Sequence, residues 1–340
     1  MTASIDAEPA VLVERRGHLG VLTLNRPRAI NALDLGMVRI MQGALDAWAG
    51  DDAVATVLVT GGGERGLCAG GDLQGMYRDA RDGTLGSVDF WRQEYDLDHT
   101  IATYAKPVVA LMDGIVLGGG VGISAHASHR VVTERTSIGM PETRIGFVPD
   151  VGGPWLLSRA PGELGTHLAL TASNADAADA IALGLADALV PIDRLPDLVV
   201  ALESGSADDV LDLLAVVPPG SDLAKERDWI DAAYVGDDAA AIVARLRSSD
   251  AEAASRAADD IESRSPTAVV LTLAALRRAA RLPDLRAALD QDLVVSTALL
   301  DIPDMAEGIR AQVIDKDRAP RWDPPALADV DPGTYAHLFG

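Results

Sequence analysis

The chain has 340 residues and carries 29 lysines and arginines against 51 aspartates and glutamates, a formal net charge of −22. A surface this acidic repels a polyanion, so nucleic acid is excluded as a main partner. With 48% hydrophobic and 24% charged residues, the composition is typical of a globular chain with a large core, built as one domain with an appendage or as two domains.

Cysteine usage and hydropathy narrow the class further. Cys68 is the only cysteine, which excludes an internal disulfide framework and a zinc site of four thiolates. The longest apolar stretch, residues 106–122, is interrupted by a proline, an aspartate and glycines, so no membrane span is expected. Residues 1–16 contain acidic residues and no apolar run after a basic segment, which predicts a cytoplasmic protein without a targeting signal.

Strand and helix patterns alternate through the first half of the chain. Runs of β-type apolar residues predict strands at 11–15, 20–24, 56–60, 108–112 and 130–133. Apolar residues at helical spacing predict helices from the N-cap Asp34 to residue 49, at 90–104 and at 121–126. This alternation predicts an α/β fold, with loops at the strand ends available for a site.

Helical spacing dominates after Gly153. Apolar residues recur at that spacing over 164–170 and 177–185, and one short strand at 188–191 interrupts them. Beyond the break at 217–221 the chain is rich in Ala, Leu, Asp and Arg and ends in a proline-rich tail from Pro320. The expected division is an α/β core that carries the site, residues 1–200, and a helical C-terminal region, residues 201–340.

Two glycine-rich loops, residues 69–72 and 117–120, follow predicted strands. Glycine lets a backbone N–H approach a ligand oxygen closely, and a helix N-terminus adds positive potential. Two such groups aimed at one point would form an oxyanion hole, although each loop alone could serve only as a tight turn. A dinucleotide fingerprint is excluded, because Ile123 stands where the last glycine should follow Gly118 and Gly120.

The segment 140–153 carries two acids on irregular backbone. Pro141 and Pro149 forbid a continuous helix, so Glu142 and Asp150 are expected among apolar neighbours rather than on a solvated face. Carboxylates in such a pocket suit nucleophilic or acid–base work. Two structural alternatives remain open, in which Asp150 caps a helix near Gly153 or Glu142 pairs with Arg144 or Arg159.

The combination of these motifs resembles the crotonase (enoyl-CoA hydratase/isomerase) superfamily. The segments that carry the resemblance are Asn25-Arg26-Pro27, Asn31-Ala32-Leu33, Leu67 to Asp72, Asp113-Gly114 and Leu117 to Gly120. Within the superfamily the chain is most similar to the 3-hydroxyisobutyryl-CoA hydrolases, through residues 90–95, 140–143, 147–153, 307–311, 314–317 and 320–322. The resemblance therefore spans nearly the whole chain.

What the resemblance implies is a core of repeated ββα units, a helical C-terminal region and an acyl-CoA substrate, with no metal and no separate cofactor. It places the oxyanion donors on the backbone of Gly71 and Gly119 and the catalytic carboxylates on Glu142 and Asp150. The residues expected to contact the substrate are Ala69, Gly71, Glu94, Gly119, Glu142, Asp150 and Arg26, the last near the mouth. Family relatives commonly form trimers or hexamers, so a homo-oligomer is expected.

The resemblance also indicates which of the reactions of the superfamily to expect. Hydratases place a second glutamate two residues after the glycine triplet, where this chain has Gly122, so hydration of an enoyl-CoA is disfavoured and double-bond isomerisation less decisively so. The expected reaction is hydrolysis of a short 3-hydroxyacyl-CoA in valine degradation, by direct attack of Glu142 or through an activated water. The remote alternative is a non-catalytic module that binds CoA esters.

Overall fold

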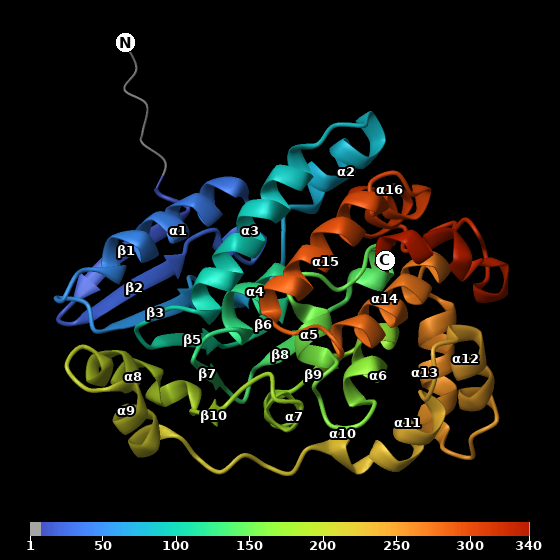
Figure 1. Cartoon of the computed structure of the whole chain (residues 1–340). Helices are drawn as coiled ribbons and strands as arrows, with labels where there is room; N and C mark the ends of the chain where they lie inside the picture. The colour runs from blue at the N-terminus through green and yellow to red at the C-terminus, as the bar shows by residue number, and fades with distance from the viewer. Residues whose placement is uncertain (1–7, 340) are drawn as a thin grey trace.

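The computed structural model describes residues 8–339 (Figure 1), so residues 1–7 of the segment expected to lack a targeting signal lie outside the described residues. The strands are β1 (Val11–Arg16), β2 (Leu19–Leu24), β3 (Thr56–Gly61), β4 (Gly66–Cys68), β5 (Val108–Met112), β6 (Ile115–Leu117), β7 (His129–Val132), β8 (Ser137–Gly139), β9 (Asn174–Ala175) and β10 (Ala188–Leu189).

From β3 to β8, consecutive strands alternate between two sheets. The six-stranded sheet has the order β1-β2-β3-β5-β7-β10, and the four-stranded sheet has the order β4-β6-β8-β9. Strands β3, β5 and β7 run parallel in the first sheet, and β4, β6 and β8 run parallel in the second. In chain order, the strands β3 and β4 are followed by helices α2 (Leu73–Asp82) and α3 (Gly86–Ala102). Strands β5 and β6 are followed by α4 (Gly119–Ala125), and strands β7 and β8 by α5 (Gly153–Leu157). This repeat confirms the predicted ββα core.

Helix α1 (Leu35–Ala49) shows how sequence sets an element. The side chain of Asp34 accepts a hydrogen bond from the N–H of Met37 at 2.9 Å, which satisfies a donor that the first turn would leave unpaired. Met37, Met41 and Leu45 follow at four-residue spacing and are fully buried. Burial of each such side chain contributes about 1.5–3 kcal/mol, so this face attaches α1 to the sheet.

The larger sheet is covered on both faces. Alternate residues of β3 point to opposite sides, so Val57 and Val59 belong to the main core whereas Leu58 belongs to a second cluster. Helices α8 (Leu195–Leu202) and α9 (Ala207–Leu214) supply the other half of that second cluster. Because both faces are buried, the central strands are almost purely apolar.

The C-terminal helices close over the side of the core that carries the glycine loops. The remaining helices are α6 (Leu164–Thr171), α7 (Ala177–Ala182), α10 (Asp222–Lys225), α11 (Arg227–Ala233), α12 (Ala239–Arg247), α13 (Glu252–Glu262), α14 (Pro266–Ala279), α15 (Leu285–Leu299) and α16 (Pro303–Ile309). Helix α15 packs against α3, and α16 packs against α2 (Figure 1). The boundary expected at residue 200 stays a prediction, and that residue lies inside α8.

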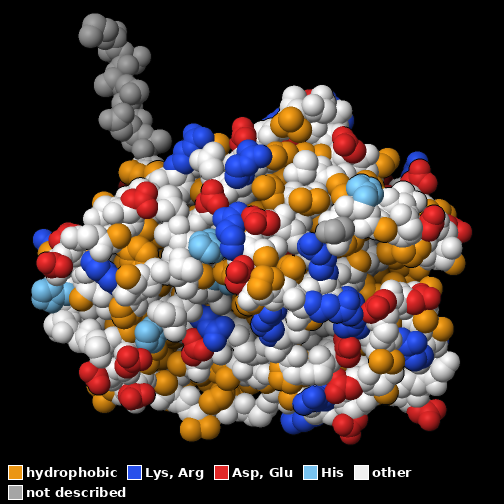
Figure 2. Space-filling model, in the orientation of Figure 1, with side chains coloured by type: hydrophobic (Ala, Val, Ile, Leu, Met, Phe, Trp, Pro, Cys, Tyr) orange, Lys and Arg blue, Asp and Glu red, His pale blue; other side chains and the backbone are white. Residues whose placement is uncertain are grey.

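Charge is dispersed over the surface despite the net charge of −22. On the face in Figure 2, acidic and basic side chains lie interspersed rather than in separate patches. Local ion pairs contribute to this arrangement, as where Arg310 contacts Glu307, Asp315 and Asp317. Within residues 8–339, no helix combines the length and apolar character needed to cross a membrane.

Candidate active site

A cavity of about 180 Å³ lies between the two glycine loops and the acid-bearing segment 141–150. Leu73, Met76, Ile145, Phe147 and Val313 give it apolar walls. Six of the seven residues expected to act on the substrate line this one cavity, namely Ala69, Gly71, Glu94, Gly119, Glu142 and Asp150. An apolar cavity with a few convergent polar groups is the usual form of a small-molecule site.

Arg26 is the expected site residue that does not line this cavity. Its Nη1 donates to the carbonyl of Ala32 at 2.6 Å and pairs with the carboxylate of Asp34 at 3.1 Å. Arg26 therefore fastens the segment that leads into α1. A role for it in contacting the CoA phosphates stays a prediction.

The backbone amides of Gly71 and Gly119 are open to a ligand. Within residues 8–339, neither N–H donates to a backbone or side-chain acceptor. Gly119 is the first residue of α4, so its N–H lies at the positive end of the helix. Both residues line the same cavity, which is the arrangement that an oxyanion hole requires.

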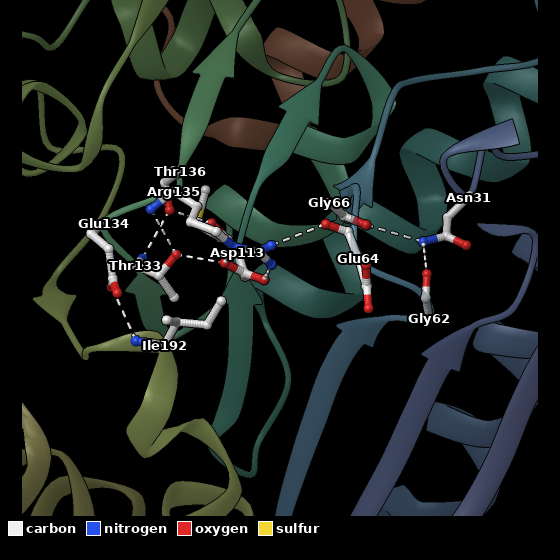
Figure 3. A network of polar contacts seen from close by, with 11 residues as sticks. Asn31, Gly62, Glu64, Gly66, Asp113, Thr133, Glu134, Arg135, Thr136 and Ile192 are labelled. Carbon is white, nitrogen blue, oxygen red and sulfur yellow. Dashed lines mark hydrogen bonds and ion pairs between the residues drawn. The ribbon is translucent and has the colours of Figure 1, made fainter. Parts of the chain in front are cut away.

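Asn31 fixes the backbone that leads into the first glycine loop. Its side-chain amide donates to the carbonyls of Gly62, Gly66 and Leu67 at 3.0, 3.1 and 3.0 Å, and the first two contacts are drawn in Figure 3. Leu33 adds backbone hydrogen bonds, donating to Gly70 at 2.8 Å and accepting from Asp72. The loop that carries Gly71 is therefore fixed by hydrogen bonds to residues before and after Gly71 in the chain.

A second polar network supports the start of that loop (Figure 3). Arg135 forms an ion pair with Asp113 and donates to the backbone carbonyl of Glu64 at 3.1 Å. Thr133 donates to the same aspartate at 2.6 Å. These contacts join the turns after β3, β5 and β7, so the loop containing β4 is anchored to both neighbouring strand ends of the larger sheet.

The second glycine loop brings two acids close to its backbone. Gly118 adopts φ 51, a left-handed conformation that favours glycine, and a Cβ added there would lie 2.8 Å from Oε1 of Glu142. A Cβ added at Gly119 would collide with Oε1 of Glu94. Both carboxylates therefore lie against the backbone that supplies the proposed oxyanion donor.

Glu142 starts the short 3-10 helix Glu142–Ile145 and is buried. In the described chain its Oε2 has no hydrogen-bond partner. Burial raises the pKa of its carboxyl well above the usual range, and the nearby charge of Asp150 raises it further. Arg144 instead donates to the carbonyl of Ala172, and Arg159 to that of Trp155, so neither of the expected ion pairs with Glu142 is present.

Asp150 is held by its side chain rather than used as a helix cap. The hydroxyl of Tyr95 donates to its Oδ2 at 2.7 Å, whereas helix α5 is preceded by Gly152, which provides no side-chain cap. Burial raises the pKa of Asp150 to about 7, and the hydrogen bond from Tyr95 opposes that rise. A group with this pKa changes protonation state near neutral pH, as acid–base catalysis requires.

Sequence reasoning missed a second buried acid on α3, Asp98. It is fully buried, and within residues 8–339 neither of its oxygens has a hydrogen-bond partner. Burial raises its pKa well above the usual range, and the charges of Asp150 and Asp292 add to the rise. The signal was present in the sequence, because Trp91, Glu94 and Asp98 recur at the three- and four-residue spacing of one helix face.

Asp98 also occupies the space beside Gly122. A Cβ added at Gly122 would lie 2.7 Å from Oδ2 of Asp98 and 2.7 Å from Cβ of Val151. A glutamate at position 122 therefore has no room unless these neighbours move. The packing around Gly122 is therefore a physical reason why α4 does not bring a second acid into the cavity.

We expect Asp98→Asn to stabilise the protein at alkaline pH. The raised pKa means that the folded state keeps a proton that the unfolded chain releases above about pH 4, so the contribution of Asp98 to stability falls as pH rises toward its folded pKa. Asparagine removes that penalty at similar volume. The free energy of unfolding at pH 8 should therefore rise relative to wild type, and the gain should vanish near pH 4.

Denaturant melts at both pH values measure this effect. Asp46→Asn, at an exposed position on α1, is the matched control and should show no pH-dependent gain. A variant at Asp98 that is no more stable than wild type at pH 8 would contradict the account of this carboxyl.

Comparison with known proteins assigns the chain to a family. The family described as enoyl-CoA hydratase/isomerase matches residues 19–339. The chain belongs to the enoyl-CoA hydratase/isomerase family. This confirms the resemblance that the motifs indicated.

Relatives in the enoyl-CoA hydratase/isomerase family also match the expected branch. A Danio rerio protein named 3-hydroxyisobutyryl-CoA hydrolase, mitochondrial, is 39% identical, over 96% of this chain and 88% of its own. The Homo sapiens protein of the same name is 34% identical, over 97% of this chain and 88% of its own. The similarity to 3-hydroxyisobutyryl-CoA hydrolases is therefore confirmed.

Solved structures that are similar to this chain carry other titles. A carnitinyl-CoA dehydratase from Mycobacterium thermoresistibile superposes with a TM-score of 0.94 at 49% identity, covering 97% of this chain and 96% of its own. An enoyl-CoA hydratase from Rhodobacter sphaeroides 2.4.1 gives a TM-score of 0.92 at 40% identity, with 97% of each chain covered. Those titles make hydration the reaction against which hydrolysis has to be tested.

Proposed function

We propose that this family member hydrolyses the thioester of a short 3-hydroxyacyl-CoA, with 3-hydroxyisobutyryl-CoA as the expected substrate. The observation that carries the proposal is the position of Glu142, whose buried carboxylate lies beside Gly118 in the cavity lined by Gly71 and Gly119. A carboxylate next to two open amides can act on the carbonyl carbon while the amides stabilise the developing oxyanion. The names of the relatives support the same activity.

Two routes use the same groups. In the first, a carboxylate oxygen of Glu142 attacks the thioester carbon, the C–S bond breaks, CoA leaves as a thiolate, and water then hydrolyses the mixed anhydride. In the second, Glu142 takes a proton from water, and the resulting hydroxide attacks the same carbon. Both routes release the hydroxy acid and CoA and regenerate Glu142, and in both Asp150 orients either the substrate hydroxyl or the water.

The raised pKa of Glu142 suits either role. A more basic carboxylate is a stronger nucleophile and a stronger general base, provided that it is ionised when the substrate is bound. The thioester itself is neutral, so its reactive end can enter a buried cavity without bringing a further charge. Glu94 and Asp150 then remain to contact polar parts of the acyl group.

Release of free thiol from 3-hydroxyisobutyryl-CoA tests the proposal, with the acid product identified by mass spectrometry. The chain's own thiol should contribute little to the signal, because Cys68 is buried and burial raises its pKa to about 12. We expect turnover of this ester and slower turnover of esters that differ by one methyl, because one methyl discriminates by about 1–3 kcal/mol.

Crotonyl-CoA is the control substrate. Hydration of crotonyl-CoA without thiol release from any hydroxyacyl ester would replace hydrolysis by the reaction named in the titles of the solved structures. Binding of CoA esters without turnover of either would leave only the binding module. Location in the cytoplasm and assembly as a trimer or hexamer stay predictions, and the names of the relatives place those proteins in mitochondria.

A further inference from the structure

We propose that Tyr95 is a positioning residue for Asp150 and that Ser296, on the C-terminal helix α15, sets the direction of its hydroxyl proton. The inference rests on the proposed role of Asp150. The Tyr95 hydroxyl lies 2.7 Å from Oδ2 of Asp150 and 3.1 Å from Oγ of Ser296. Tyr95 and Ser296 have no exposed surface, and Asp150 is also buried, so bulk water does not compete for these hydrogen bonds.

The direction of the two hydrogen bonds follows from the chemistry of the groups. An ionised Asp150 can only accept, so Tyr95 must donate its single hydroxyl proton to Oδ2. Tyr95 then has only lone pairs left for Ser296, which must donate in turn. The chain Ser296–Tyr95–Asp150 is therefore fully ordered when Asp150 is charged, and removal of either hydroxyl selectively disfavours the charged form.

The backbone after Asp150 is held by two further contacts, one from the end of α4 and one from α15. Val151 adopts φ 51, a conformation that valine rarely occupies and that neighbouring contacts must maintain. Its carbonyl lies 2.8 Å from Nε2 of His126, and the N–H of Gly152 donates to Oδ2 of Asp292 at 2.8 Å. Because burial lowers the pKa of His126 to about 4, this histidine is neutral and Nε2 is its donor.

Helix α15 thus supports Asp150 in two ways. Ser296 contacts Tyr95, which binds the Asp150 side chain, and Asp292 binds the backbone N–H of Gly152, two residues after Asp150. Ser296 and Asp292 are four residues apart and lie on one helix face. The C-terminal helical region, which lies far from the glycine loops in sequence, therefore helps to set the geometry and the protonation of the proposed active site.

Other acids also act on the charge of Asp150. Glu142 approaches from the 3-10 helix, Glu94 and Asp98 from α3, and Asp292 from α15. Each of them would disfavour a second negative charge if it were ionised. With no Arg or Lys side chain contributing to the pKa of Asp150, Tyr95 is the group whose side-chain hydrogen bond stabilises the ionised form.

Tyr95→Phe tests the proposal, because it removes one hydroxyl and keeps the ring. A hydrogen bond to a charged group corresponds to an upward pKa shift of about one to two units when it is lost. The Asp150-dependent limb in the pH profile of kcat/KM should move to higher pH by that amount, and kcat at pH 7 should fall by about 10-fold or more with a smaller change in KM. Ser296→Ala should shift the same limb in the same direction by less.

Tyr104→Phe is the matched control. The Tyr104 hydroxyl donates to the carbonyl of Leu45 at 2.6 Å, and Tyr104 does not line the cavity. This variant should lose stability without moving the pH profile. If Tyr95→Phe fails to fold, Ser296→Ala still carries the test, since the smaller residue is expected to fit.

A readout without turnover separates this inference from the proposed hydrolysis. Protein labelled with 13C at the aspartate carboxyl carbons gives the pKa of Asp150 by NMR titration, with Asp150→Asn identifying its signal. An upward shift of the Asp150 pKa in Tyr95→Phe and Ser296→Ala supports the proposed roles of Tyr95 and Ser296, even if wild type releases no thiol. An unchanged pKa of Asp150 in both variants overturns it, whatever the activity.

Discussion

Glu142→Gln is expected to lower kcat for thiol release from 3-hydroxyisobutyryl-CoA by about 10²–10⁴-fold, the usual contribution of a positioned acid–base group. Glutamine keeps the size of the side chain, but its amide is neither a nucleophile nor a base. Since the open amides of Gly71 and Gly119 are untouched, the thioester should still bind. KM should therefore change far less than kcat, which is the pattern of a lost transition-state interaction.

The stability of the Glu142→Gln variant gives a second, independent test of the role of this carboxyl. The pKa of Glu142 is raised by burial, so its ionised form costs folding free energy above the usual pKa of a glutamate. Loss of activity should therefore come with equal or higher stability, and a denaturant melt excludes unfolding as the cause. Stabilisation at the expense of function is common for active-site acids.

Glu163→Gln is the matched control for Glu142→Gln. Glu163 pairs with Arg277 at 2.9 Å away from the cavity lining, so its loss should lower stability and leave kcat near the wild-type value. Near wild-type turnover by Glu142→Gln would remove Glu142 from the mechanism. A covalent route predicts, in addition, a mass increase on Glu142 when wild type is quenched during turnover, whereas the water route predicts none.

The sequence predicted the elements whose patterns are local. Helix α1 was expected from Asp34 to residue 49 and is found there, because a cap and a four-residue apolar repeat are written in consecutive positions. Strand β5 was expected at 108–112 and has those bounds. In contrast, β4, β6 and β8 were missed, since three residues are too few to show a period and their pairing depends on strands distant in sequence.

The candidate site divides in the same way. Glycines and acids in short motifs could be recognised, and Gly71, Gly119, Glu94, Glu142 and Asp150 do line one cavity. The contributions of Ser296 and Asp292 could not be predicted, because they arise where α15 packs against segments that are distant in sequence. Ser296 contacts Tyr95 on α3, and Asp292 contacts the backbone of Gly152.

Gly119→Ala is expected to lower kcat by about 10²–10³-fold, as loss of a single oxyanion donor does in comparable sites. The added methyl would collide with Oε1 of Glu94 and lie 3.2 Å from Cδ1 of Leu33. Gly119 does not occupy the left-handed region, so the cost comes from this collision and not from backbone strain. Relief of the contact must displace either the first turn of α4, which carries the donor, or the Glu94 carboxylate.

A matched glycine shows that the effect is local. Gly43 lies within α1, and a Cβ added there meets nothing within 4 Å, so Gly43→Ala should leave kcat unchanged and stabilise the helix by roughly 0.5–1 kcal/mol. Gly71→Ala should be milder than Gly119→Ala, because its methyl would lie 2.8 Å from Cε of Met76, the end of a flexible side chain.

Glu94→Ala combined with Gly119→Ala tests whether the collision with the Glu94 carboxylate causes the loss. Removal of the Glu94 carboxylate makes room for the new methyl, so the donor should return toward its original place. Adding Gly119→Ala to a Glu94→Ala background should then cost much less than adding it to wild type, a coupling that a double-mutant cycle measures directly. Equal costs in both backgrounds would show that the methyl blocks the substrate itself and that the Gly119 amide had not moved.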